Sequence, residues 1–346
     1  MEDRSPNGPK TLHEATTLQR LALNALKVLI PIGIFSYLLW SVAPEDYRAF
    51  LNEDKRWGLI ALAQVLAICA ILISFFRWYV LVRAFDIAFT YREALRLGFL
   101  GYLLNFVSFG SVGGDLFKAI LVAKDKPDRR PEAIASVLFD RALGLLGLLL
   151  LAWLCLSLAA TETLAPTLVA IRNAAGIIAA LSIAGLMVAI FAGAWFDRIV
   201  GQVQKLRVVG EPIARMALAV RLLRKRPQVL LLLGTCSIGV HALLATTVFV
   251  ISKGVYEDHP TLAEHMMVVP PAMAAGTLPL APGGIGYQEG ALAGLFRLLP
   301  DLPGRFSGIL VATIYRLITL TIAGIGLVIY FFSRDRELTG DTGQDD

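Results

Sequence analysis

Long apolar blocks separated by short polar breaks form the main pattern of the chain. A helix of about 20 apolar residues crosses the roughly 30 Å hydrocarbon layer of a bilayer. Blocks long enough to do so lie at about 21–40, 57–83, 132–160, 167–194, 228–252 and 305–332. We therefore expect an all-α integral membrane protein with about six transmembrane helices.

Two further apolar regions, about 92–124 and 261–299, do not have the pattern of a single helix. Glycine and small polar residues fill the centre of the first, from Asn105 to Asp115, and glycine and proline fill that of the second, from Gly276 to Glu289. Lipid cannot form hydrogen bonds with the backbone N–H and C=O groups that an interrupted helix leaves free. Such segments must therefore be buried in protein or line a water-filled cavity. We expect each region to form two half-helices in a re-entrant hairpin, the first with half-helices at about 92–106 and 115–124.

The two irregular regions carry charged residues in the same order. Asp115 lies 26 residues before Arg141, and Glu289 lies 27 residues before Arg316. This predicts an inverted repeat with halves at about 57–194 and 228–333. Discontinuous helices in inverted repeats are common in secondary transporters, where the substrate site lies at the repeat interface.

The distribution of basic residues predicts the orientation. With the N-terminus in the cytoplasm, the inner segments carry about 21 Lys and Arg and the outer ones about six, so both termini are expected inside. Basic and apolar residues alternate at helical spacing in 195–227, which predicts an amphipathic helix on the cytoplasmic leaflet. The chain thus divides into a polar segment 1–20, a single membrane domain 21–335 and a polar tail 336–346.

Composition agrees with a membrane protein. Hydrophobic residues make up 56% and charged residues 17% of the 346 residues, whereas soluble domains carry about a quarter charged residues. The net charge of +5 reflects the basic loops, so no nucleic-acid partner is expected. Cys69, Cys155 and Cys236 lie in apolar segments without metal-ligand spacing, and no metal or cofactor is expected.

Arg141 and Arg316 lie inside predicted spans, where a charge must be paired or face a polar cavity. In one interpretation they form structural ion pairs with Asp115 and Glu289, and Asp140 belongs to the same set. In the other they bind a lipid phosphate, for which the planar guanidinium is suited. Asp115 and Glu289 are also candidates for helix caps or for a proton or cation site.

The candidate head-group site includes small and polar residues beside these charges, because glycine permits tight turns and close backbone approach. They are Asn105, Gly113, Gly114, Gly283, Gly284 and Gly286. Arg77 and Arg172 are expected to extend to the membrane interface. His241 is expected to be a buried structural residue, and His259 and His265 to lie at the interface.

These motifs resemble a known family. The segment from Asn105 to Gly-Gly-Asp115, the pair Asp140-Arg141 and Pro-Gly-Gly-Ile-Gly-Tyr-Gln-Glu289 are similar to the transmembrane region of lysylphosphatidylglycerol synthases, over about 20–335. That region also occurs alone in flippase-like membrane proteins. In the synthases it is taken to flip the aminoacylated lipid, while a separate soluble domain transfers the aminoacyl group. Because about ten residues follow the last predicted span, the resemblance implies no synthase activity here, and the lipid need not be lysylphosphatidylglycerol.

We expect a lipid transporter or flippase of the cell (inner) membrane rather than an enzyme. It would carry a phospholipid or lipid-linked head group through a central polar cavity. A small polar solute as cargo remains open, as does a homo-oligomer or an envelope-biosynthesis partner. The alternatives are an intramembrane transferase that uses Asp115, Asp140 or Glu289 on a lipid substrate, and a non-transporting subunit that presents 195–226 to a partner.

Overall fold

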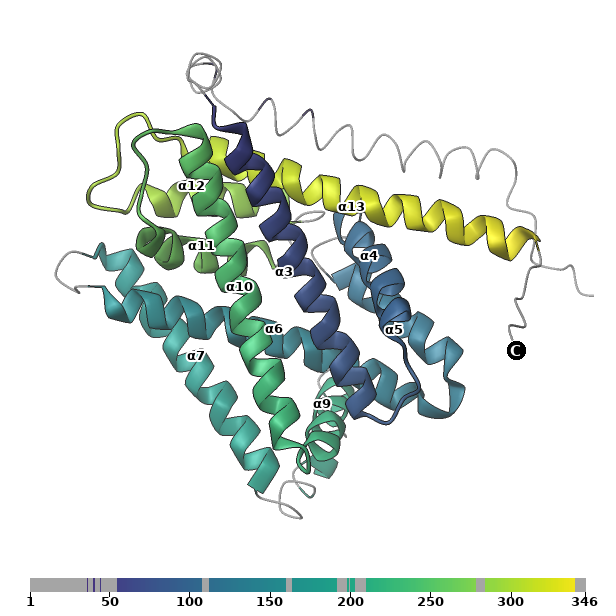
Figure 1. Cartoon of the computed structure of the whole chain (residues 1–346). Helices are drawn as coiled ribbons and strands as arrows, with labels where there is room; N and C mark the ends of the chain where they lie inside the picture. The colour runs from purple at the N-terminus through teal and green to yellow at the C-terminus, as the bar shows by residue number, and fades with distance from the viewer. Residues whose placement is uncertain are drawn as a thin grey trace, which may run out of the picture.

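The computed structural model describes residues 55–107, 112–159, 164–191, 210–277 and 284–339, with residues 36, 40, 44, 198 and 200–202 in addition. All regular structure in these ranges is helical (Figure 1). The helices are α3 (Trp57–Ala84), α4 (Tyr91–Val107), α5 (Val112–Asp125), η1 (Pro127–Arg129), α6 (Arg130–Leu158), α7 (Pro166–Phe191), α9 (Gly210–Leu223), α10 (Pro227–Val255), α11 (Leu262–Gly276), α12 (Tyr287–Phe296) and α13 (Gly308–Thr339). The all-α prediction is confirmed for the described part of the chain.

Five of the described helices are long and apolar enough to cross a membrane. These spans are Trp57–Ala84, Pro127–Leu158, Pro166–Phe191, Pro227–Val255 and Gly308–Ile329, and they match five of the six predicted ones. The sixth prediction, 21–40, lies outside the described residues, as does the segment 1–20. Helix α13 continues to Thr339, beyond the predicted end of the span at 332, because a helix satisfies its own backbone hydrogen bonds after it leaves the apolar layer.

Helices α3 and α10 lie side by side and antiparallel (Figure 1). At one end of the pair the backbone N–H of Arg56 donates to the carbonyl of Gly254 over 2.9 Å. At the other end the guanidinium of Arg226 donates to the carboxylate of Asp86 over 2.8 Å. The start of α10 and the end of α3 therefore lie on the same side of the molecule.

The half-helices predicted in the first irregular region correspond to α4 and α5, and α11 and α12 occupy the second. The connecting residues 108–111 and 278–283 lie outside the described part. A Cβ built on Gly114 of α5 would lie 1.9 Å from the carbonyl oxygen of Gly101 in α4. Only glycine allows the two backbones to approach so closely.

Helices α4 and α11 start with the same capping motif, Thr-x-x-Glu. The backbone N–H of Thr90 donates to the Glu93 carboxylate over 2.6 Å, and the Glu93 N–H donates to the Thr90 hydroxyl over 3.2 Å. Thr261 and Glu264 form the same reciprocal bonds, at 2.6 and 3.3 Å. The box satisfies backbone donors at each helix start.

Two apolar cores hold the helices together. One surrounds Trp78, Phe85 and Leu223 and includes buried residues of α3, α4, α5, α6 and α9. The other surrounds Phe296 and Ile322 and includes buried residues of α10, α11, α12 and α13. The half-helices α4 and α5, the first broken pair, thus pack mainly in one core. The half-helices α11 and α12, the second broken pair, pack in the other, while α4 contributes to both.

Helix α9 lies within the segment predicted to be amphipathic, 195–227. Ala217, Val220 and Leu223 are buried on one face, whereas Arg221 is exposed, as is Arg224 directly after the helix. The helix therefore joins the molecule by its apolar face and leaves basic side chains outside.

Candidate functional site

The carboxylate of Asp115, in the first turn of α5, contacts two cations. Arg141 of α6 donates from Nη1 to Oδ2 of Asp115. The ammonium of Lys118, one turn along α5, lies 3.6 Å from the other oxygen, Oδ1. At the start of α5 the N–H of Gly114 donates to Oδ1 of Asn105 over 3.0 Å, which ties α5 to the end of α4. Gly113 is half-buried beside this contact.

Lys118 is a site residue that the sequence analysis missed. Its ammonium lies 5.8 Å from the ring centre of Phe75 and 5.4 Å from that of Trp78, both on α3. A Cβ on Gly101 would come within 2.6 Å of its side chain. The available signal was its spacing: a lysine three residues after Asp115, within an apolar half-helix, lies on the same helix face.

The second ion pair joins Arg316 of α13 to Glu289 of α12. Nε of Arg316 donates to Oε1 of Glu289, and Nη2 donates to the side-chain oxygen of Gln288 over 3.1 Å. The other oxygen of Glu289 accepts from the N–H of Gly286 over 2.7 Å at the start of α12. Both charged side chains are buried.

Glycines shape the start of α12. Gly284 and Gly286 have φ values of +68° and +82°, which side chains rarely tolerate. A Cβ on Gly284 would lie 2.5 Å from the carbonyl oxygen of Gly276 at the end of α11. The predicted site residue Gly283 lies outside the described residues.

The end of α4 connects the two pairs. Asn105 of α4 accepts a hydrogen bond from the N–H of Gly114, next to Asp115 of the first ion pair. The next residue, Phe106, has its ring centre 5.8 Å from the Arg316 guanidinium of the second pair. The structure therefore places both predicted clusters next to one segment, with Arg141 and Arg316 in separate ion pairs.

A third buried ion pair corrects the prediction for Arg77, which was expected at the interface. Arg77 of α3 donates from Nε to Oδ1 of Asp140 over 2.8 Å and from Nη2 to Oδ2 over 3.0 Å. Its Nη1 donates to the hydroxyl of Ser237 in α10 over 2.8 Å. The arginine is buried because these partners face it from two neighbouring spans.

The histidines differ from one another in their surroundings. His241 is partly buried, and its Nε2 lies 2.9 Å from the carbonyl oxygen of Gly144. His265, expected at the interface, is fully buried, with its ring nitrogens 2.8 Å from the Ser252 hydroxyl and 2.9 Å from the Thr261 carbonyl oxygen. It connects the start of α11 to α10. Among the described residues, no three His, Cys, Asp or Glu side chains group as metal ligands would.

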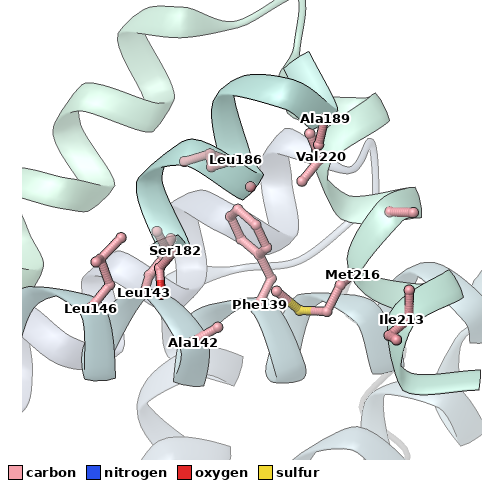
Figure 2. Close-up of a pocket in the computed structure, with 12 residues that line it drawn as sticks. Phe139, Ala142, Leu143, Leu146, Ser182, Leu186, Ala189, Ile213, Met216 and Val220 are labelled. Atoms are coloured by element: carbon pink, nitrogen blue, oxygen red, sulfur yellow. The ribbon is translucent and has the colours of Figure 1, made fainter. Parts of the chain in front are cut away.

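Two cavities open on the side of α6 that packs against α7. One, of about 300 Å³, lies between α6, α7 and α9, where Figure 2 shows Phe139 between Leu186 and Met216. The other, of about 540 Å³, lies between α6, α7, α11 and α12. Among the described residues that line them, only Ser182 and Thr167 carry side-chain hydroxyls. These cavities suit hydrocarbon, and the charged clusters lie elsewhere.

Similarity to known proteins agrees with this arrangement. Residues 24–326 match the lysylphosphatidylglycerol synthase TM region. No curated protein and no solved structure matches the chain. The match covers four of the described spans and most of the fifth, Gly308–Ile329, as well as both broken helix pairs, and no other domain was found. The chain therefore belongs to the family of the lysylphosphatidylglycerol synthase transmembrane region, a multi-pass membrane domain associated with lipid modification and flippase activity.

Proposed function

We propose that the chain moves a phospholipid or a lipid-linked head group between the two leaflets of the cell membrane. The observation that carries this proposal is the placement of charge. Arg141 and Arg316 lie in membrane-spanning helices, and each pairs with a carboxylate in the first turn of a short, broken helix. A charge at such depth costs about 2.5–3.5 kcal/mol on insertion scales and commonly marks a substrate path.

The proposed mechanism is alternating exposure of a polar passage next to the end of α4. The head group travels inside, where an arginine exchanges its carboxylate partner for the lipid phosphate. The acyl chains stay in the bilayer and contact apolar surfaces such as the two cavities along α6. Apolar walls suit the chains because they replace one hydrocarbon environment with another.

An inverted repeat of two re-entrant hairpins is part of the proposal. Each half has a Thr-x-x-Glu box, a half-helix, glycines, an acidic half-helix and then a span with an arginine. The acid-to-arginine separations of 26 and 27 residues agree. The basic loops favour cytoplasmic termini. In that topology the first hairpin starts from inside and the second from outside.

The structure favours transport over the alternative of a lipid-linked transferase. A transferase needs a carboxylate that is available as a base or metal ligand. Asp115, Asp140 and Glu289 each accept from an arginine. Such pairing suits a gate or a binding site better than a catalytic base.

The test is lipid movement in proteoliposomes. Phospholipid with a fluorescent head group is placed in both leaflets, and an impermeant quencher reports how fast inner-leaflet lipid reaches the outside. Arg141→Gln and Arg316→Gln are compared with the native protein and with Arg224→Gln, which removes an exposed charge outside the site. A charged hydrogen bond contributes about 1.5–3 kcal/mol, so we expect each site variant to be about tenfold or more slower.

The controls decide the interpretation. Arg224→Gln should move lipid at the native rate, and all variants must elute as folded protein in gel filtration. If the native protein moves no anionic, zwitterionic or polyprenyl-linked lipid, the transferase or subunit alternatives replace transport.

A further inference from the structure

One face of α7 lines both cavities along α6. It consists of residues that belong to one cavity or the other: Thr167, Ile171, Ile178, Ser182, Leu186 and Ala189. Their spacing of three, four or seven residues places them on the same side of the helix. From Thr167 to Ala189 this face rises about 33 Å, roughly the thickness of the hydrocarbon layer. The two cavities therefore follow one another along a single seam that crosses the membrane.

Helix α6 supplies the opposite wall of this seam. Phe139 and Leu146 line the cavity beside α9 (Figure 2), and Leu149 and Ala152 line the cavity beside α11 and α12. We call the first the inner cavity, because the basic helix α9 is expected on the cytoplasmic side. The second is the outer cavity. In the proposed topology each leaflet thus has one cavity on the α6–α7 seam.

The seam is apolar throughout. No charged side chain is among the described residues that line the two cavities. The hydroxyl of Ser182 donates to the carbonyl oxygen of Ile178 over 2.8 Å, so α7 itself satisfies this polar group. The chemistry that such a surface accommodates is hydrocarbon.

The size of the cavities indicates which hydrocarbon fills them. An empty cavity would cost its walls the dispersion contacts that a filled one provides. A transmembrane helix is too wide: about 7 Å of a helix some 10 Å across, less than two turns, would take up the 540 Å³ of the outer cavity. An acyl chain is a single row of methylene groups, and acyl chains are the medium around these spans.

Glycines keep both cavities open. Gly185 lines the inner cavity and Gly294 the outer one, and a Cβ added to either would meet nothing within 4 Å. Gly176 of α7 differs, since a Cβ there would lie 2.5 Å from the ring of Trp153 in α6. The two helices touch at Gly176, whereas Gly185 and Gly294 border space that a larger side chain could fill without moving the backbone.

We propose that the α6–α7 seam is the acyl-chain path of the transported lipid. A chain occupies the inner cavity before the lipid crosses and the outer cavity afterwards, while the head group takes the polar passage next to the end of α4. The path rests on the proposed function for the identity of the cargo as a lipid.

The test uses one variant for each cavity. Gly185→Leu fills the inner cavity and Gly294→Leu fills the outer one. Gly239→Leu on α10 is the matched control, because Gly239 is also exposed, a Cβ there meets nothing within 4 Å, and it lines neither cavity.

Occupancy is measured by photolabelling. Phosphatidylglycerol with a diazirine in its acyl chain is incorporated into proteoliposomes of the full-length protein and activated by light, and peptide mass spectrometry locates the label. In the native protein we expect more label at Met216 of the inner cavity and Leu298 of the outer cavity than at Leu181, which is exposed on α7 outside both.

The variants should change this pattern one cavity at a time. Gly185→Leu should reduce the label at Met216 to the level of Leu181 and leave Leu298 unchanged, and Gly294→Leu should do the converse. Each should also slow lipid movement about fivefold or more, the loss that overpacking a filled site commonly causes. Gly239→Leu should give the native labelling pattern and the native rate.

Three results would overturn the path. Equal label at all three positions in the native protein would show that chains cover the surface without preference. Less label in the cavities than at Leu181 would show that another helix fills them. A native labelling pattern in both cavity variants would show that the open space is not used.

Labelling needs no transport, so it separates the two proposals. Label concentrated in the cavities without lipid movement would retain them as chain-binding sites and reject the flippase. Lipid movement with uniform label would retain the flippase and reject the seam as its path.

Discussion

At the scale of single residues, Arg77 of α3 has a carboxylate of α6 and a hydroxyl of α10 as partners. Arg77→Met would leave the half-buried carboxylate of Asp140 without its cation, and loss of one partner of a buried ion pair typically destabilises a protein by about 3–5 kcal/mol. The double variant Arg77→Met/Asp140→Leu removes both charges. We expect its unfolding temperature to be close to that of the native protein. Thermal unfolding of the detergent-solubilised protein, followed by tryptophan fluorescence, measures both. Equal destabilisation in the single and double variants would show that the pair contributes nothing specific.

The same residues show what the sequence could predict. The contacts of Asp115 with Arg141 and of Glu289 with Arg316 each join neighbouring helices, so their spacing suggested them. Arg77 contacts a residue 63 positions away, and that contact depends on how α3 packs against α6. Lys118 had a local signal, its helical spacing from Asp115, but its position over two rings of α3 needed the packed structure.

At the scale of helices, the approach of α4 and α5 depends on Gly114. Alanine there would place Cβ 1.9 Å from the Gly101 carbonyl oxygen and 2.5 Å from Oδ1 of Asn105. Because backbone must move, we expect Gly114→Ala to cost about 1–3 kcal/mol. We also expect it to slow lipid movement in proteoliposomes, since Asp115, the partner of Arg141, follows directly. Thermal unfolding and the proteoliposome assay test both effects.

The control is Gly234→Ala on α10, where an added Cβ meets nothing within 4 Å. Alanine favours helix over glycine by up to about 1 kcal/mol, so this variant should be as stable as the native protein or more so. If Gly114→Ala behaves the same way, the two half-helices can separate freely and the close contact has no role in the site.

Apolar length predicted most helices to within a few residues, because each span must cross the same hydrocarbon layer. The breaks at Asn105–Asp115 and Gly276–Glu289 were visible because glycine and proline interrupt helices. The far end of α13 was not, since Ser333–Glu337 is polar but still helical. Helix bounds follow from local chemistry, whereas the antiparallel contact of α3 with α10 depends on side chains across the whole molecule.

At the scale of the whole molecule, orientation in the membrane decides which side each hairpin starts from. Arg224 and Asp258 are exposed at opposite ends of α10. In a background without Cys69, Cys155 and Cys236, we expect an impermeant maleimide to label Asp258→Cys in intact cells. Arg224→Cys should react only after the membrane is opened, because basic loops stay in the cytoplasm. The reverse pattern would show that both hairpins have the opposite orientation in the membrane. Labelling of both cysteines from outside would show that α10 does not span the membrane.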